Sequence, residues 1–173
     1  MSGKNGSTIK NLKKINLLAR LNESELEKLS TICKHVSINS GNVIMHEGEV
    51  GDSMFLFVDG VVDVTKNLTL KVGKKGFSKV EKSMVKLNSQ HVSFFGDMAM
   101  FENDVRSATL TAATDCTLYE IKRDEFETLC GQYPELGYKI IREIAVILCE
   151  RVRKGNQDVL KLTTALSIAL SKG

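Results

Sequence analysis

Residues 95–108 read Phe-Gly-Asp-Met-Ala-Met-Phe-Glu-Asn-Asp-Val-Arg-Ser-Ala, and the rest of the chain is best interpreted from this stretch outward. It begins with a glycine and a carboxylate, leaves room for a helical turn over residues 98–101, and ends on Arg106 and Ser107. A helix N-terminus presents unpaired backbone N–H groups, and a guanidinium can bind two anionic oxygens at once. Gly96 would let a ligand approach the backbone closely. The stretch therefore predicts a site for a small anion such as phosphate.

Asp97 does not suit a phosphate, because like charges repel. A carboxylate beside an anion site does suit a ribose hydroxyl, which can donate a hydrogen bond to it. Asp97 and Arg106 together therefore predict a sugar phosphate as the ligand.

Residues 95–108 resemble the phosphate-binding cassette of the cyclic nucleotide-binding domain family, which includes bacterial cyclic AMP receptor proteins, regulatory subunits of cyclic AMP-dependent protein kinase and cyclic nucleotide-gated channels. Upstream, residues 41–60 read Gly-Asn-Val-Ile-Met-His-Glu-Gly-Glu-Val-Gly-Asp-Ser-Met-Phe-Leu-Phe-Val-Asp-Gly and are similar to the glycine-punctuated strand pair that precedes the cassette in that family. The chain departs from the family pattern at Asp97, where Glu is usual, and at Val92, where Gly is usual. The resemblance implies that the ligand contacts are Gly96, Asp97, Met98, Ala99, Arg106 and Ser107.

The same resemblance implies a non-enzymatic regulatory module that binds a cyclic nucleotide, with cyclic AMP favoured over cyclic GMP. Cyclic GMP stays an alternative, because hydroxyl residues at the position of Ser107 hydrogen-bond a guanine amino group in some relatives. It also implies that the module signals to an unidentified effector protein by movement of its C-terminal helices. The shorter Asp97 and the bulkier Val92 leave a second hypothesis open, a protein-interaction scaffold with a vestigial pocket. No helix-turn-helix or other DNA-binding domain is expected in this sequence.

Residues 37–122 are rich in short β-prone runs separated by Gly, Asn, Asp and Ser. The runs are residues 43–45, 54–58, 61–65, 68–72, 84–87, 109–113 and 117–121. Many short strands with tight turns predict a sandwich or a barrel. The family resemblance implies a jelly-roll β-roll of about eight antiparallel strands. Asp59-Gly60, between two of the runs, predicts a type I′ hairpin.

Helices are predicted on both sides of this β-roll, over residues 9–36 and 123–171, after a disordered tail at residues 1–8. Asn22, with Glu25 three residues later, has the pattern of a capping box. Pro134 suits the first turn of a helix that runs to about Lys154. Gly155-Asn156 predicts a break and a hinge before a last helix over residues 157–170. Residues 9–173 are thus predicted to form one domain.

The last helix carries apolar residues at heptad-like spacing, which predict either a homodimer or packing of the helix on its own domain. They are Val152, Val159, Leu162, Leu166 and Ala169.

The composition is that of an ordinary globular domain, with 42% apolar and 26% charged residues in 173. The four cysteines have no metal or C-x-x-C spacing, and no apolar run is long enough to span a bilayer, so a cytoplasmic location is predicted. The three histidines stand singly, and no G-x-S-x-G or Walker motif occurs, so neither a metal site nor an enzyme is predicted. Residues 66–86 contain seven lysines, which indicate either an acidic partner or an exposed hairpin with protected strand edges.

Overall fold

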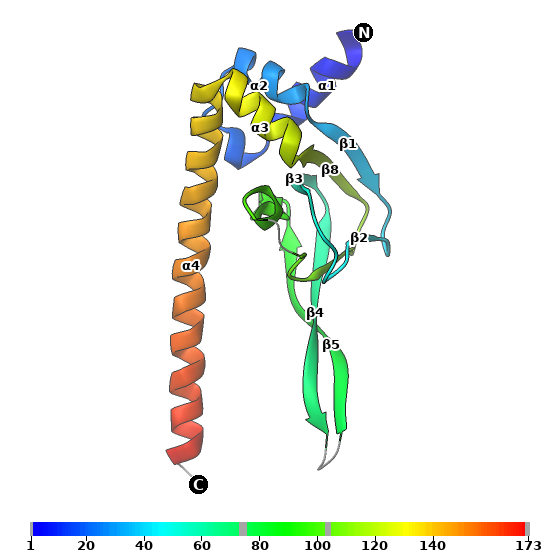
Figure 1. Ribbon diagram of the computed structural model, residues 1–173. Helices are drawn as coiled ribbons and strands as arrows, with labels where there is room; N and C mark the ends of the chain where they lie inside the picture. Colours follow the sequence, from blue (N-terminus) through cyan, green and yellow to red (C-terminus); the bar gives the residue numbers. More distant parts are fainter. Residues whose placement is uncertain (1, 73–75, 103–104, 172–173) are drawn as a thin grey trace.

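The computed structural model describes the backbone of residues 2–72, 76–102 and 105–171, and the side chains of residues 6–67, 85–102 and 105–171. The β-strands form two four-stranded antiparallel sheets, with helices at one end (Figure 1). The first sheet has the order β1 (Lys34–Ile38), β8 (Cys116–Lys122), β3 (Ser53–Asp59) and β6 (Phe94–Phe95). The second has the order β2 (Val43–Met45), β7 (Thr109–Ala112), β4 (Val61–Val72) and β5 (Gly76–Asn88). The predicted jelly-roll of about eight antiparallel strands is confirmed.

The first sheet is buried on both faces, because its strands alternate between two hydrophobic clusters. In β3, Phe55 and Phe57 point into the cluster shared with the second sheet, whereas Met54 and Leu56 point into the cluster shared with the helices. This explains why five consecutive residues of β3 are buried. The sheet therefore ties the β-roll to the helical layer.

The N-terminal helices are α1 (Ser2–Leu12), the 3₁₀ helix η1 (Asn16–Leu18) and α2 (Glu23–Ser30). The predicted capping box of α2 is confirmed, since the Glu25 backbone N–H donates to the Asn22 side chain and the Asn22 N–H donates to the Glu25 carboxylate, both at 2.9 Å. The prediction of a disordered tail at residues 1–8 is wrong, because α1 begins at Ser2. Leu12 is fully buried, and a helix anchored at one end extends without a second nucleation step.

The predicted helical region also extended too far, to residue 36, because β1 already begins at Lys34. Leu26 and Leu29 of α2 are buried, but Val36 belongs to β1 and pairs with Leu118 of β8. Alternation of Val36 and Ile38 with polar residues suits a strand.

Asp59-Gly60 does not form the predicted hairpin, because β3 and β4 belong to different sheets. Gly60 has φ 116°, and a Cβ there would lie 2.6 Å from the Cys116 Sγ, so the glycine allows a tight crossover between the layers. The hairpin is instead formed by β4 and β5, and residues 73–75 lie outside the described residues.

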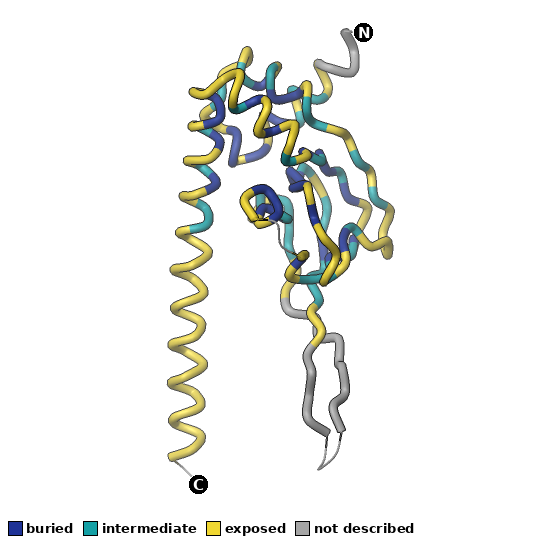
Figure 2. The backbone as a smooth tube through the Cα atoms, in the orientation of Figure 1, coloured by how far each residue is buried: buried dark blue, intermediate teal, exposed yellow. Residues whose placement is uncertain are grey.

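The C-terminal helices are α3 (Arg123–Gln132) and α4 (Pro134–Ser171), and α4 is one continuous helix. The predicted start at Pro134 is confirmed, but the predicted break and hinge at Gly155-Asn156 are wrong. A single glycine costs a helix only about 1 kcal/mol, and the nearby Arg153, Lys154 and Gln157 are good helix formers. Only the first part of α4 packs on the domain, and Figure 2 shows every residue beyond its middle as exposed.

Candidate functional site

The cassette forms the predicted turn of helix, over Asp97–Met100 as the 3₁₀ helix η2. Gly96, just before it, has φ 73°, a left-handed conformation that favours glycine. β6 leads into this turn from the first sheet, where Phe95 pairs with Phe55 of β3. The cassette is therefore held against the centre of the fold by a two-residue strand.

Arg106 is buried, with 9% of its surface exposed, and it lies across the cassette. Its Nη1 donates to the Gly96 carbonyl at 3.1 Å, and its Nη2 donates to the Ser53 Oγ at 3.3 Å. Burial lowers the pKa of the Arg106 guanidinium, and the nearby carboxylates of Asp52, Glu49 and Glu120 oppose that shift. Since arginine stays protonated in proteins, the site holds a partly desolvated cation.

Ser53 and Glu120 support this guanidinium from the first sheet. Ser53 is 3% exposed and donates its hydroxyl to the Glu120 Oε1 at 3.2 Å. Glu120 in turn accepts a hydrogen bond from Lys34 at 3.1 Å. Glu120 thus supplies a carboxylate that offsets the charge of Arg106, and the Ser53 hydroxyl lies between the two groups.

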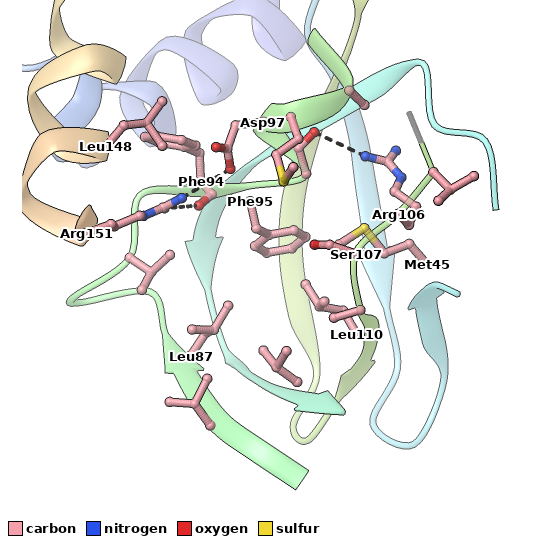
Figure 3. A pocket seen from close by; sticks show the side chains of 18 residues that line it. Met45, Leu87, Phe94, Phe95, Asp97, Arg106, Ser107, Leu110, Leu148 and Arg151 are labelled. Carbon is pink, nitrogen blue, oxygen red and sulfur yellow. Dashed lines mark hydrogen bonds and ion pairs between the residues drawn. The ribbon is translucent and has the colours of Figure 1, made fainter. Parts of the chain in front are cut away.

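A cavity of about 440 Å³ opens beside the cassette, a size typical of small-molecule sites. The six predicted contact residues Gly96, Asp97, Met98, Ala99, Arg106 and Ser107 all line it (Figure 3). Its other walls are mostly apolar side chains from both sheets, such as Phe95 of the first sheet and Leu87 and Leu110 of the second. The sequence-predicted residues are thus brought together around one cavity, and their contact with a ligand stays a prediction.

Arg151 of α4 reaches into the same cavity and was not predicted from the sequence. Its Nη1 lies 3.1 Å from Asp97 Oδ1, and its Nη2 donates to the Phe94 carbonyl at 2.8 Å. Its guanidinium also stacks on the Phe94 ring at 4.6 Å from the centroid. The carboxylate predicted to bind a ribose is therefore paired with a cation from the C-terminal helix (Figure 3).

A periodic signal for Arg151 does exist in the sequence. Ile144 and Leu148 face the domain, and Arg151 follows them at helical spacing on the same side of α4. An arginine at the end of an inward-facing stripe can extend its apolar stem along the core and place its charge at the rim.

Gly51 also has a role that the sequence did not reveal. Gly41, Gly48 and Gly60 of the upstream stretch have positive φ, but Gly51 does not. A Cβ at Gly51 would lie 2.4 Å from the Arg106 Nε and 2.5 Å from its Cζ. Gly51 therefore makes room for the functional side chain.

We expect Gly51→Ala to displace the Arg106 guanidinium while leaving the fold intact, because the clash falls on the end of a flexible side chain. Anion affinity should fall about tenfold, the equivalent of one charged hydrogen bond. Calorimetric titration and urea unfolding of Gly51→Ala check this, with Gly131→Ala as the control, since a Cβ at Gly131 meets no atom within 4 Å. Unchanged affinity would show that Arg106 tolerates the displacement.

Among the described residues, no cluster of three or more His, Cys, Asp or Glu side chains could hold a metal ion. Within the same part of the chain, no helix combines the length and apolar character needed to cross a membrane.

The profile of the family named "Cyclic nucleotide-binding domain" matches residues 35–133, which is more than half of the chain and includes the whole cassette. Together with the jelly-roll and the cassette geometry, this match shows that the chain belongs to the cyclic nucleotide-binding domain family.

Relatives in this family include a potassium channel and a protein kinase regulatory subunit. A cyclic nucleotide-gated potassium channel of Rhizobium etli is 30% identical over 131 residues, which cover 75% of this chain and 32% of the channel. A cAMP-dependent protein kinase regulatory subunit of Dictyostelium discoideum is 28% identical over 126 residues, covering 72% of this chain and 36% of the subunit. The chain spans about a third of the length of these relatives.

Solved structures share the fold at lower identity. The crystal structure of a cyclic nucleotide-binding domain from Methylobacillus flagellatus has a TM-score of 0.72 at 22% identity, covering 91% of this chain and 83% of that one. The catabolite activator protein of Thermus thermophilus has a TM-score of 0.67 at 20% identity, covering 85% of this chain and 62% of that one.

Proposed function

We propose that this domain is a non-enzymatic regulatory module that binds a cyclic nucleotide in the cavity beside η2 and signals through α4. The observation that carries the proposal is the buried Arg106 guanidinium, which faces a cavity of about 440 Å³ beside the glycine-led turn of the cassette. A desolvated guanidinium binds a phosphate more strongly than an exposed one, because water competes less for both charges.

The cyclic phosphate lies at Arg106 and Ser107 in this proposal, with the backbone of Gly96, Met98 and Ala99 around it. The ribose then reaches Asp97. A carboxylate has about four lone-pair positions, so Asp97 can accept from a ribose hydroxyl and from Arg151 together. The contact with Arg151 holds the short Asp97 side chain in place, which offsets its missing methylene relative to the usual Glu.

Cyclic AMP is the preferred ligand in this proposal. The walls away from the cassette are lined by Val64, Val85, Leu87 and Val92. Guanine has a carbonyl where adenine has its amino group, and it adds a second-position amino group and a ring N–H, so it would place more polar groups against these apolar side chains. Burying a polar group without a partner costs free energy. Competition between cyclic AMP and cyclic GMP for one fluorescent analogue measures the preference, and a marked preference for cyclic GMP would reverse it.

Calorimetry and thermal unfolding with both nucleotides test binding itself. A ligand at 100 times its Kd stabilises a fold by about 2.7 kcal/mol, which gives a measurable rise in Tm. An absence of binding at millimolar concentrations of both nucleotides would favour the scaffold with a vestigial pocket, the hypothesis that Asp97 and Val92 leave open.

Signalling through α4 rests on the contacts of Arg151 and Leu148 with the cavity. Because α4 is continuous through Gly155, we expect it to move as one rigid body. A shift at Arg151 would then reach the exposed end of the helix. A bound nucleotide can shift α4 only by its differential affinity for the two positions.

We expect Arg151→Ala to weaken nucleotide binding about tenfold, since it removes a half-exposed ion pair and frees Asp97 to turn away from the ribose. It should also abolish the nucleotide-induced change in hydrogen exchange along residues 148–160. Arg153→Ala is a matched control, because Arg153 lies on the same helix with its side chain exposed. Tighter binding by Arg151→Ala would instead mean that Arg151 and the ribose compete for Asp97.

A homodimer through α4 is part of the proposal. The heptad-like residues Val152, Val159, Leu162 and Leu166 are 60–71% exposed, so the stripe does not pack on its own domain. A second copy of α4 would bury it as a short coiled coil. Sedimentation should show a dimer that Leu162→Glu converts to a monomer, whereas a wild-type monomer at high concentration, with and without nucleotide, would contradict it.

A further inference from the structure

Arg123 stands where the β-roll ends and the C-terminal helices begin. β8 ends at Lys122, and Arg123 is the first residue of α3. Its side chain turns back toward the cassette and is half-buried. Neither the cassette resemblance nor the cavity lining involves this residue.

The guanidinium of Arg123 donates to carbonyl oxygens of two separate segments. Nε donates to Ala99 at 2.6 Å, and Nη2 donates to Glu102 at 3.0 Å, both at the end of the cassette turn. Nη2 also donates to Gly51 at 3.2 Å, in the turn that precedes β3. A charged donor makes stronger hydrogen bonds than a neutral one, so these contacts fix the two segments relative to each other.

The backbone of Arg123 makes a further hydrogen bond to the segment that contains Gly51. Its N–H donates to the Asp52 carbonyl at 2.8 Å. Gly51 in this turn lies directly against the Arg106 guanidinium, where no Cβ would fit. Arg123 therefore positions two segments. One contains Gly51 and forms a wall of the Arg106 site, and the other is the cassette turn on the opposite side of Arg106.

Arg123 is also rigidly joined to α4. Gly137 of α4 packs so closely on α3 that a Cβ there would lie 2.7 Å from the Cys130 Sγ. The Gly137 N–H also donates to the Tyr133 carbonyl at 3.0 Å, across the junction of the two helices. A displacement of the N-terminus of α3 should therefore also move α4, because closely packed elements leave little free volume between them.

We propose that Arg123 is a positioning residue for nucleotide binding, which clamps the cassette turn and the Gly51 turn around Arg106 and connects both to α3. The inference rests on the proposed function for its ligand, but the clamp itself is a property of the nucleotide-free protein. In this proposal the side chain of Arg123 alone links the anion site to the C-terminal helices.

The test compares Arg123→Ala and Arg123→Lys with Lys122→Ala, a change of the exposed neighbouring residue. The probes are cyclic AMP or cyclic GMP, whichever the wild-type protein binds more tightly, and the corresponding nucleoside without phosphate. Affinity for the cyclic nucleotide should fall roughly 10- to 100-fold in Arg123→Ala. Affinity for the nucleoside should change much less, because it does not use Arg106. Arg123→Lys should recover part of the loss, and Lys122→Ala should bind like the wild type.

Hydrogen exchange without nucleotide gives an independent readout. Amides of residues 50–52 and 99–102 should exchange at least several-fold faster in Arg123→Ala, while those of β3 and β8 stay protected. Equal losses of affinity for nucleotide and nucleoside, or unchanged exchange in these two segments, would overturn the clamp. If the wild-type protein binds no cyclic nucleotide, the proposed function fails, and the exchange comparison still decides whether the clamp exists.

Discussion

Arg106→Ala is expected to weaken cyclic nucleotide binding strongly, with a loss of about 2–5 kcal/mol, the range for removing one partner of a buried charge pair. This corresponds to a reduction in affinity of roughly 30-fold to several thousand-fold. The loss is large because the guanidinium is already desolvated and held between Gly96 and Ser53, so a phosphate meets a cation that needs little reordering.

Isothermal titration calorimetry measures this loss, and Arg106→Lys separates charge from geometry, since lysine keeps the charge without the planar fork. Arg142→Ala is the control, because Arg142 is a half-exposed arginine on α4 that pairs with Glu143. Urea unfolding is needed alongside, because the carboxylates of Asp52, Glu49 and Glu120 lose a counter-charge in Arg106→Ala. Wild-type affinity in a folded Arg106→Ala protein would refute the phosphate site.

The cassette was predictable from the sequence because its chemistry is local. Gly96, Asp97 and Arg106 lie within a dozen residues, and the conformation of Gly96 follows from its own lack of a side chain. The capping box at Asn22 and the start of α4 at Pro134 were predictable for the same reason. In each case the deciding interaction lies within a few residues along the chain.

The features that the sequence did not predict depend on contacts between distant segments. β1 follows α2 closely and is a strand because it pairs with β8, far along the chain. Asp59-Gly60 has the composition of a hairpin, but pairing of β3 with β8 and of β4 with β7 places the two strands in different sheets. Local turn chemistry specifies a reversal of the chain, and tertiary pairing decides which strands it joins.

The residues that support the site from behind were not predicted, for a related reason. Arg123 and Arg151 read as ordinary helix arginines, and only the fold brings their guanidinium groups to the cassette. Ser53 and Glu120 sit at polar positions of strands and gain their role only beside Arg106. The sequence thus predicted residues that line the cavity, and it did not predict the residues that hold them in place.

Phe94→Ala is expected to lower the free energy of unfolding by about 3–5 kcal/mol, as for other buried Phe to Ala changes. Phe94 is 0% exposed and lies in the cluster that joins the first sheet to the helices. Typical domains are stable by only about 5–15 kcal/mol, so this one side chain accounts for a large share of the total. Urea unfolding followed by circular dichroism measures the change.

Phe101→Ala is the matched control, since Phe101 follows η2 in the same cassette with 51% of its surface exposed. Its effect should stay within about 0.5 kcal/mol. A similar loss in both variants would mean that the cassette as a whole, and not the core beneath it, limits stability.

The Phe94 change should also disturb α4, because the ring is the surface on which the Arg151 guanidinium stacks. Without the ring, Arg151 loses this contact and its ion pair with Asp97 becomes more exposed to water, which weakens it. Phe94→Leu separates the two effects, since leucine refills much of the cavity but offers no aromatic face. We expect Phe94→Leu to recover most of the stability while hydrogen exchange near Arg151 stays raised. Full recovery of both would show that Phe94 supports α4 by volume alone.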